Sequence, residues 1–350
     1  EAANFMGGAN MLLSAFTKAA VAGLAASVGL GAFSARAADF SGKTIEILIG
    51  FGPGGGHDAY ARALAPFYGK NLPGNPTVVA RNMPGAGSLL VLNHIASVAP
   101  TNGLVIGTFD PQLLIAPLLG DQNARYDVNK LNWIGSIVDG TNVCITWTQS
   151  GITTWQDLMS DKPINFGSTG PAAALYQHTA ILKNMFGSKV RMVSGYAGTA
   201  EVRLAMERGE ITGNCGDNWA SLKGTAADLI AEKKISIPVQ FATKKHAELP
   251  DVPLVLDQAK SEEDKAALRV LLGGQATGRP YAVAPNTPPD IVAALREGFA
   301  KTMADPEFIQ FANKMRLDLN PVTGAAMEKM LADIYRTPAG AVERAKAVIK

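Results

Sequence analysis

The sequence has few of the residues from which metal sites are built. Its 350 residues include two cysteines and four histidines. None of these histidines falls in an H-E-x-x-H pattern or in a paired Cys/His spacing, so we expect no metal site. Basic clusters are missing as well: 32 basic and 30 acidic residues are spread along the chain and give a net charge of +2. This distribution argues against nucleic acid as a partner.

Nucleotide and hydrolase motifs are also missing. The loop 52–57 supplies only the first two glycines of G-x-G-x-x-G, because the sixth position is His57. The phosphate-binding pattern G-x-x-x-x-G-K-[ST] is absent, and "GSTG" at 167–170 does not have the spacing of the nucleophile elbow G-x-S-x-G. We therefore expect no nucleotide, no serine nucleophile of that type and no cofactor.

No hydrophobic run reaches the roughly 20 apolar residues that a spanning helix needs. The run at 19–33 follows Met11 and Lys18 and precedes an A-R-A pattern at 35–37. This order is typical of an export signal and predicts cleavage after Ala37. We expect the first ten residues to lie upstream of the natural start at Met11, and the mature chain to be periplasmic.

The two cysteines, Cys144 and Cys215, lie far apart in the sequence. An oxidising compartment permits a disulfide, but a chain of this length buries enough surface to fold without one. We therefore predict free, buried thiols and leave open whether the two residues pair.

Short apolar runs alternate with helical patterns along the exported region, which predicts an α/β fold with a largely parallel sheet. The run "TIEILIG" at 44–50 is nearly continuous, as in a strand covered on both faces. Further strands are expected at 104–106, 164–166 and 281–285. Apolar residues recur every four positions from Ile291 to Met303, after "NTPPD", and predict a late helix.

Three loops that lead into expected helices are rich in glycine and alanine or carry hydroxyl side chains. They are "GPGGGHD" at 52–58, "GSTGPAAA" at 167–174 and "GYAGTAE" at 195–201. We predict Asp58 and Thr199 as helix N-caps and Pro171 as a first helical residue. Free backbone N–H groups at the positive end of a helix dipole attract anions, so these loops predict an anion site.

Several side chains near these loops allow two interpretations. His57 either donates to a bound carboxylate or packs on its loop, and capping is favoured over ligand contact for Asp58. Asp110 and Asp217 follow expected strands, where open α/β sheets bind ligands, but solvated loop acids are the alternative. Four aromatic residues could floor a pocket or belong to the core: Phe51, Phe109, Tyr196 and Trp219.

The order of segments along the chain resembles the periplasmic solute-binding receptors of the tripartite tricarboxylate transporter family, the Bug-type receptors. The resemblance spans nearly all of the exported region and departs from the family at His57, where a small residue such as Thr is common. The segments that carry it are "ILIGFGPGGGHDAYARALAPFYG", "VVARNMPGAGSLLVLNHIASVAPTNGLVIGTF", "YDVNKLNWIGSIV", "WQDLMS", "INFGSTG", "GYAGTAEVRLAMERGEITG", "HAELPDVPLV" and "APNTPPDIVAALREGF".

The resemblance implies a type II periplasmic-binding-protein fold, with two α/β domains, a two-strand hinge and a ligand cleft between them. It implies a discontinuous first domain of 38–138 plus 240–350, and a second domain of 139–239. Arg279 would then either reach a second carboxylate or brace the hinge.

The family holds a ligand carboxylate largely through backbone N–H groups and waters of the loops that match 51–58 and 168–172 here. The segments 85–88 and 196–199 would complete the cleft. The predicted ligand-binding residues are Phe51, Gly54, Gly55, Gly56, His57, Asp58, Gly87, Ser88, Ser168, Thr169, Gly170, Ala172, Tyr196, Gly198, Thr199 and Asp217.

We interpret the chain as a non-enzymatic, monomeric receptor that captures a small organic carboxylate and delivers it to a membrane permease. The alternative is an exported hydrolase or transferase that acts on a small acidic substrate in the same cleft; no Ser, His and Asp have motif spacing for it. An adhesion module, a third possibility, would have neither hinge nor ligand. The acid and the permease are not identified by the sequence.

Overall fold

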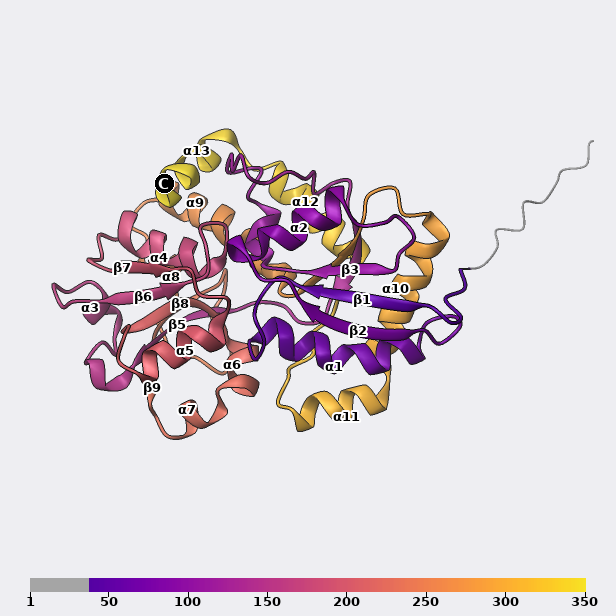
Figure 1. The fold of residues 1–350 in the computed structure, drawn as a ribbon. Helices are drawn as coiled ribbons and strands as arrows, with labels where there is room; N and C mark the ends of the chain where they lie inside the picture. Colours follow the sequence, from indigo (N-terminus) through magenta and orange to yellow (C-terminus); the bar gives the residue numbers. More distant parts are fainter. Residues whose placement is uncertain (1–37) are drawn as a thin grey trace, which may run out of the picture. The chain divides into compact units, whose positions relative to one another are not determined.

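The computed structural model describes residues 38–350, so the predicted export signal, start and cleavage site lie outside the described residues. These residues form two mixed β-sheets with helices on both faces (Figure 1). The first sheet has the order β11 (Val322–Thr323), β4 (Asn132–Ser136), β10 (Pro280–Val283), β3 (Val105–Thr108), β1 (Thr44–Ile49) and β2 (Thr77–Asn82). The second has the order β7 (Arg191–Ser194), β6 (Asn165–Ser168), β8 (Gly213–Asn218), β5 (Asn142–Trp147) and β9 (Ile235–Phe241).

The strand directions correct the prediction of a largely parallel sheet. Strands β1, β2 and β3 are parallel, as are β6, β7 and β8. In contrast, β10 runs antiparallel to β3 and β4, and β5 runs antiparallel to β8 and β9. The antiparallel strands β4, β5 and β10 adjoin the segments that pass from one sheet to the other. We call the part built on the first sheet the first lobe and the part built on the second sheet the second lobe.

Strand β1 is covered on both faces, as its continuous apolar run predicts. Ile47 and Ile49 pack in one cluster with residues of α1 and α10, whereas Leu48 packs in another with residues of α2 and α12. The prediction of the late helix is confirmed by α10, which runs through 291–303. The helices of the first lobe are α1 (Gly56–Lys70), α2 (Leu89–Ser97), α10 (Pro289–Ala304), α11 (Pro306–Lys314) and α12 (Gly324–Tyr335).

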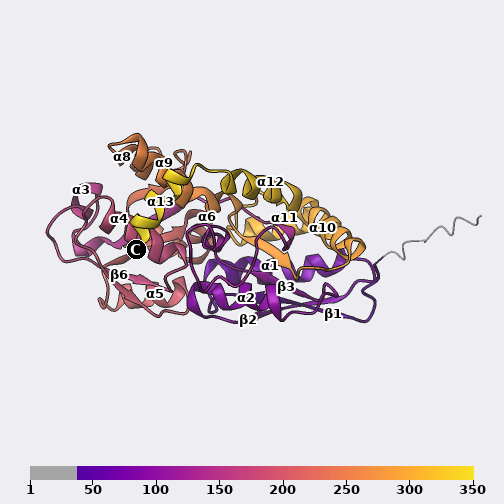
Figure 2. The same ribbon diagram turned by 90° about the horizontal axis from the view of Figure 1, so that it is seen from above.

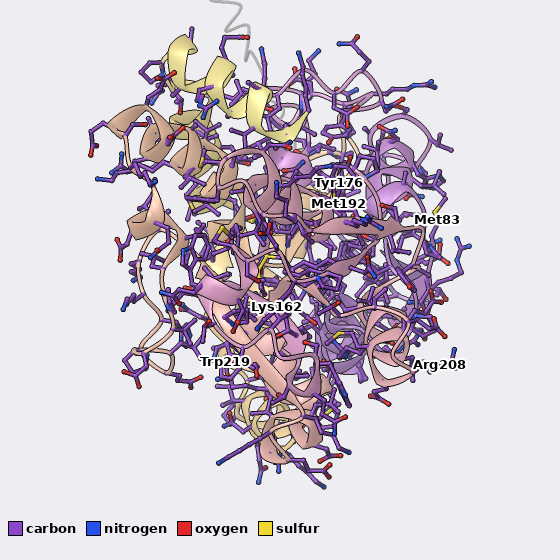
Figure 3. The ribbon with its side chains drawn as sticks, turned by 90° about the vertical axis from the view of Figure 1, so that its left-hand side faces the viewer. Met83, Lys162, Tyr176, Met192, Arg208 and Trp219 are labelled. Carbon is purple, nitrogen blue, oxygen red and sulfur yellow. A yellow bond between two sulfur atoms is a disulfide. The ribbon has the colours of Figure 1, made fainter. Side chains whose placement is uncertain are left out.

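The second lobe also has a core on each face of its sheet. Residues of α4, α9 and α13 share one cluster, while residues of α5 and α6 share the other. Figure 2 shows α13 beside α9 and α4, and Figure 3 views this lobe from its own side, with Trp219 of α6 labelled. The helices are α3 (Trp155–Leu158), α4 (Ala174–Asn184), α5 (Thr199–Glu207), α6 (Trp219–Thr225), α7 (Ala227–Ala231), α8 (Val255–Gln258), α9 (Glu262–Gly273) and α13 (Ala339–Ile349).

Two segments connect the lobes side by side, as in a two-strand hinge: 137–141, after β4, and 274–279, before β10. A third segment, 336–338, leads from α12 of the first lobe to α13 of the second. The backbone N–H of Arg279 donates to the carbonyl of Val138 at 3.3 Å and to the Ser136 hydroxyl at 2.9 Å. Gly278 has φ +49°, and a Cβ there would collide with the Val138 carbonyl. The domain limits 138/139 and 239/240 stay a prediction; α8, α9 and α13 pack with the second sheet.

The prediction of free thiols is wrong, because Cys144 and Cys215 form a disulfide. Cys144 of β5 lies directly opposite Cys215 of β8 in the antiparallel ladder. Strand pairing therefore brings together two residues that are 71 positions apart in the sequence.

Candidate functional site

An enclosed cavity lies between the two lobes. The volume open to the centres of water molecules is ≈ 50 Å³, a few times the volume that one water molecule requires. Only a compact ligand therefore fits without movement of the lobes. The first lobe lines it with Phe51, Gly55, Gly56, His57, Asp110 and Pro111. The second lobe and the hinge line it with Gly140, Asn142, Thr169, Ala174, Leu175, Thr199, Gly216, Asp217, Asn218, Gln275, Gly278 and Arg279.

The N-termini of several helices meet at this cavity. Gly55 and Gly56 begin α1, Ala174 begins α4, Thr199 begins α5, and Asn218 is the N-cap of α6. The first N–H groups of a helix have no intrahelical acceptor and lie at the positive end of its dipole. The three predicted loops therefore contribute positive potential to one enclosed space.

The cap assignments made from the sequence are wrong in detail. Helix α1 has Gly55 as its N-cap, and Asp58 is its third residue. The Asp58 carboxylate accepts from the Gly54 N–H at 3.0 Å, and its other partners are Arg62 and Asn82, at 2.8 Å each. Asp58 thus braces the glycine loop and does not line the cavity.

Two further helix starts differ from the prediction for the same reason. The N-cap of α5 is Gly198, so Thr199 is the first helical residue and not the cap. Helix α4 begins at Ala174, three residues after Pro171. In each case the N-cap residue has no side chain that caps the helix, so the first N–H groups of the helix are free to bind groups from elsewhere in the fold.

The guanidinium of Arg279 is the dominant charge of the cavity. The residue is 4% exposed and forms no ion pair with any acid of residues 38–350. Its Nη1 donates to His57, its Nη2 donates to the Ser221 hydroxyl, and its Nε has no hydrogen-bond partner. The face of the guanidinium lies over the Tyr60 ring at 5.1 Å. Burial lowers the pKa of Arg279, which reflects the cost of an uncompensated charge.

His57 positions this guanidinium. Its Nε2–H donates to the Phe109 carbonyl at 3.0 Å, and its Nδ1 accepts from Arg279 at 2.8 Å. Both ring nitrogens are thus engaged within the chain, although the ring also lines the cavity. Burial, the first cause, and the charge of Arg279 lower the pKa of His57 well below its usual value, so the ring is neutral.

The space beside Arg279 requires a glycine at position 56. A Cβ on Gly56 would collide with Nη2 of Arg279 and would lie 2.5 Å from the Ser221 hydroxyl. One glycine of the loop therefore makes room for a charged side chain of the hinge.

Asp110 places a carboxylate of the first lobe at the cavity. Its Oδ1 accepts from the Gln112 N–H at 2.9 Å, and its Oδ2 accepts from the Ala174 N–H, the first of α4, at 3.1 Å. The Ser88 hydroxyl accepts from the Asp110 N–H at 2.8 Å and fixes its backbone. Burial raises the pKa of Asp110 to about 6. Asp217, the other acid at the cavity, pairs with buried Arg203 at 3.0 Å.

The predicted ligand-binding residues divide into two groups. Those that line the cavity are Phe51, Gly55, Gly56, His57, Thr169, Thr199 and Asp217. Those that lie outside its lining are Gly54, Asp58, Gly87, Ser88, Ser168, Gly170, Ala172, Tyr196 and Gly198. The possible aromatic floor reduces to Phe51, since Phe109, Tyr196 and Trp219 do not line the cavity.

Several residues of the second group join the lobes instead. The Gly52 N–H donates to the Ala197 carbonyl, beside Gly198, at 2.8 Å. A Cβ on Gly170 would lie 2.8 Å from the Gly87 nitrogen, so the two glycine segments approach closely. Glycine permits this approach because it has no side chain. At the rim, Lys223 of α6 pairs with Asp318 of the first lobe at 2.7 Å.

The sequence did not place the hinge residues in the site. Gly140, Gln275 and Gly278 line the cavity, and Arg279 was considered without a decision between ligand and hinge. The signal for Gln275, Gly278 and Arg279 is the position of "GGQATGRPYA" at the start of the returning strand β10, whereas Gly140 lies before β5. Within residues 38–350, no group of His, Cys, Asp and Glu side chains could hold a metal ion, and no helix is both long and apolar enough to cross a membrane.

Comparison with known proteins identifies the family. The model of the tripartite tricarboxylate transporter family receptor matches residues 61–350. The chain belongs to this receptor family. A UPF0065 protein of Bordetella pertussis is 22% identical over 291 residues, which are 81% of this chain and 83% of that protein.

Solved structures support the same fold. The periplasmic binding protein BugD is similar with a TM-score of 0.69 and 20% identity, over 88% of this chain and 98% of that one. MatC of Rhodopseudomonas palustris, solved with bound malate, is similar with a TM-score of 0.67 and 17% identity, over 88% of this chain and 99% of that one. The chain thus has the two-domain, type II-like fold of periplasmic binding proteins, and it is a solute-binding receptor rather than an enzyme.

Proposed function

We propose that this receptor captures a small organic carboxylate in the cavity between its lobes, in the periplasm, and delivers it to the permease of a tripartite transporter. The observation that carries the proposal is Arg279, a buried guanidinium that borders the cavity and forms no salt bridge with an acid of the described chain. A buried charge without a counterion is costly, and a ligand carboxylate would compensate it. The similar protein MatC, solved with malate, and the family assignment support a carboxylate.

Backbone amides are the second part of the proposed site. The N-termini of α1 and α5 border the cavity at Gly56 and Thr199, one from each lobe. Their N–H groups can donate to carboxylate oxygens without adding a charge that must be desolvated. We assign one carboxylate of the ligand to these amides and to Arg279 together.

Lobe closure follows from such a ligand. The lobes already touch through the Gly52 N–H and the Ala197 carbonyl, and through Lys223 and Asp318. A ligand that bonds to residues of both lobes favours the closed arrangement by its higher affinity for it. All the lining residues come from one chain, so a monomer, the predicted state, suffices to bind the ligand.

Thermal unfolding tests the proposal. The purified receptor is unfolded and refolded to remove carried-over ligand, and is then heated with mono-, di- and tricarboxylates and amino acids, each beside its methyl ester. A ligand at about 100 times its Kd adds roughly 2.7 kcal/mol to the free energy of unfolding. We expect one class of acid to raise Tm and its ester to have no effect. If the folded, empty protein responds to none of these acids, or equally to the esters, the proposal is wrong.

A further inference from the structure

Three side chains that line the cavity have hydrogen-bond acceptor capacity that no group of the described chain uses. The Asp110 carboxylate accepts only two backbone N–H groups, although its two oxygens can accept about four. The Gln275 Oε1 and the Thr169 hydroxyl are buried and have no hydrogen-bond partner in the described chain. All three residues border the same enclosed space.

The side-chain amide of Gln275 is engaged at one end. Its Nε2 lies 2.6 Å from Nε2 of His178, a buried histidine that stacks on Phe241. Its other end, Oε1, has no hydrogen-bond partner in the described chain. Buried acceptors of this kind are rare in folded proteins, since each costs the free energy of lost hydration. A ligand that brings donors would satisfy them.

The charged groups of the cavity also favour a ligand that carries both a positive and a negative group. Asp110 and Arg279 are close enough to shift each other's pKa, yet no ion pair joins them. The other charged or titratable groups nearby are already engaged: Asp217 with Arg203, His57 with Arg279, and His178 with Gln275. The Asp110 carboxylate and the Arg279 guanidinium thus feel each other's charge, but neither forms a salt bridge within the described chain.

We propose that the ligand is a small amino acid whose ammonium group donates to Asp110, Gln275 and Thr169, while a carboxylate pairs with Arg279. This inference rests on the proposed function and specifies its ligand. An ammonium group has three donors and no acceptor, which matches three acceptors in number and kind. A second carboxylate at this position would meet Asp110 as a like charge, and a hydroxyl would offer one donor without charge.

The same ammonium group would couple binding to closure. Asp110 belongs to the first lobe, whereas the N–H of Ala174 that it accepts begins α4 of the second lobe. The ammonium group would add a charge-assisted hydrogen bond to this carboxylate. An amino acid would thereby bond to a residue that itself joins the lobes, which a plain acid without a nitrogen cannot do.

Calorimetric titration of the refolded receptor with matched acids tests the inference. The sets are alanine, lactate and propionate, then aspartate, malate and succinate, and finally glutamate and glutarate. At pH 7.5 we expect the amino acid of at least one set to bind ten times or more as tightly as its counterpart without nitrogen. If a hydroxy acid or plain acid binds as tightly as its amino acid, the inference is overturned and the proposed function stands. If no carboxylate binds, the proposed function fails as well.

Two variants assign the effect to the acceptors. Asp110→Asn should reduce the preference for the amino acid to about threefold or less, while Asp251→Asn, at an exposed acid away from the cavity, should leave it unchanged. Asp110 also holds α4, so Thr169→Val provides a second test that removes only an unpartnered hydroxyl. It should weaken the amino acid several-fold and the plain acid by less. An equal loss for both ligands in both variants would overturn the inference.

Discussion

The positive N-termini of α1 and α4 both border the cavity, but only that of α4 binds a carboxylate from the other lobe. Helix α1 begins with Gly55 and Gly56 at the cavity, and the acid of its first turn, Asp58, bonds to the Gly54 N–H upstream of them. Helix α4 begins in a similar small-residue segment, but the carboxylate of Asp110 sits on its first N–H group. One positive helix end is thus open to a ligand, and the other already holds an anion from the opposite lobe.

The difference shows that a bare helix N-terminus does not by itself identify a ligand site. The small-residue segments before α1 and α4 both predict a bound anion. At α4 the anion is part of the protein and joins the lobes, whereas at α1 the neighbouring charge is Arg279, which forms no salt bridge in the described chain. The side chain that arrives from elsewhere in the fold decides which helix N-terminus is left for a solute.

Removal of the charge beside α1 tests the comparison most strongly. Arg279→Met should weaken carboxylate binding by about 100-fold, since loss of one partner of a buried charge pair costs about 3 kcal/mol. The free receptor should become more stable in urea, because a buried, uncompensated cation disappears. Arg269→Met, at an exposed position of α9, is the matched control. Unchanged affinity in Arg279→Met would show that the helix ends alone bind the ligand.

A methyl group at the start of α1 should disturb the same charge by steric contact. In Gly56→Ala the new Cβ collides with Arg279 and Ser221, so we expect a loss of roughly 1–3 kcal/mol in the free energy of unfolding. In Gly340→Ala, within α13, the Cβ meets no atom within 4 Å, and a gain of up to about 1 kcal/mol is expected. Urea denaturation measures both. Equal stability of the two variants would mean that the space beside Arg279 is not tight.

Each of the two helices also carries a neutral histidine, and these should make the receptor acid-sensitive. Burial lowers the pKa of His57 well below its ordinary value and that of His178 to about 3. Below pH 6.5 the unfolded chain therefore binds protons that the folded chain does not, and stability falls. Asp110, with its pKa raised to about 6, opposes this in part because the folded chain then takes up a proton. From pH 7.5 to 5.5 the net loss should be about 2 kcal/mol.

The variant His178→Leu separates the α4 histidine from the α1 histidine. It should reduce the loss between pH 7.5 and 5.5 by about 1.4 kcal/mol, the contribution of one such group. Urea denaturation at a series of pH values provides the measurement. A variant with the same pH dependence as the original chain would show that His178 takes up its proton in the folded state.

Local patterns were sufficient to predict much of the fold and part of the site. The continuous run of β1 and the four-residue period of α10 are dictated by burial and are confirmed. The meeting of the glycine loops in one cleft was expected from the family resemblance and not from their local pattern. Local patterns do not contain partners that are distant in sequence: the register that pairs Cys144 with Cys215, and the lack of a salt bridge to Arg279 in the described chain.

The weakest effect is expected at a glycine that the sequence assigned to the ligand and the structure assigns to the lobe contact. Gly198 has an extended backbone, with φ 179°, and a Cβ there would meet Gly52 at 3.5 Å and Phe51 at 3.7 Å, which are ordinary contacts. As Gly198 is the N-cap of α5, Gly198→Ala should cost about 0.5–1 kcal/mol of stability and change ligand affinity less than about twofold. Titration and urea denaturation of one preparation measure both effects. A large loss of affinity would show that Gly198 contacts the ligand together with Thr199, the next residue, which lines the cavity.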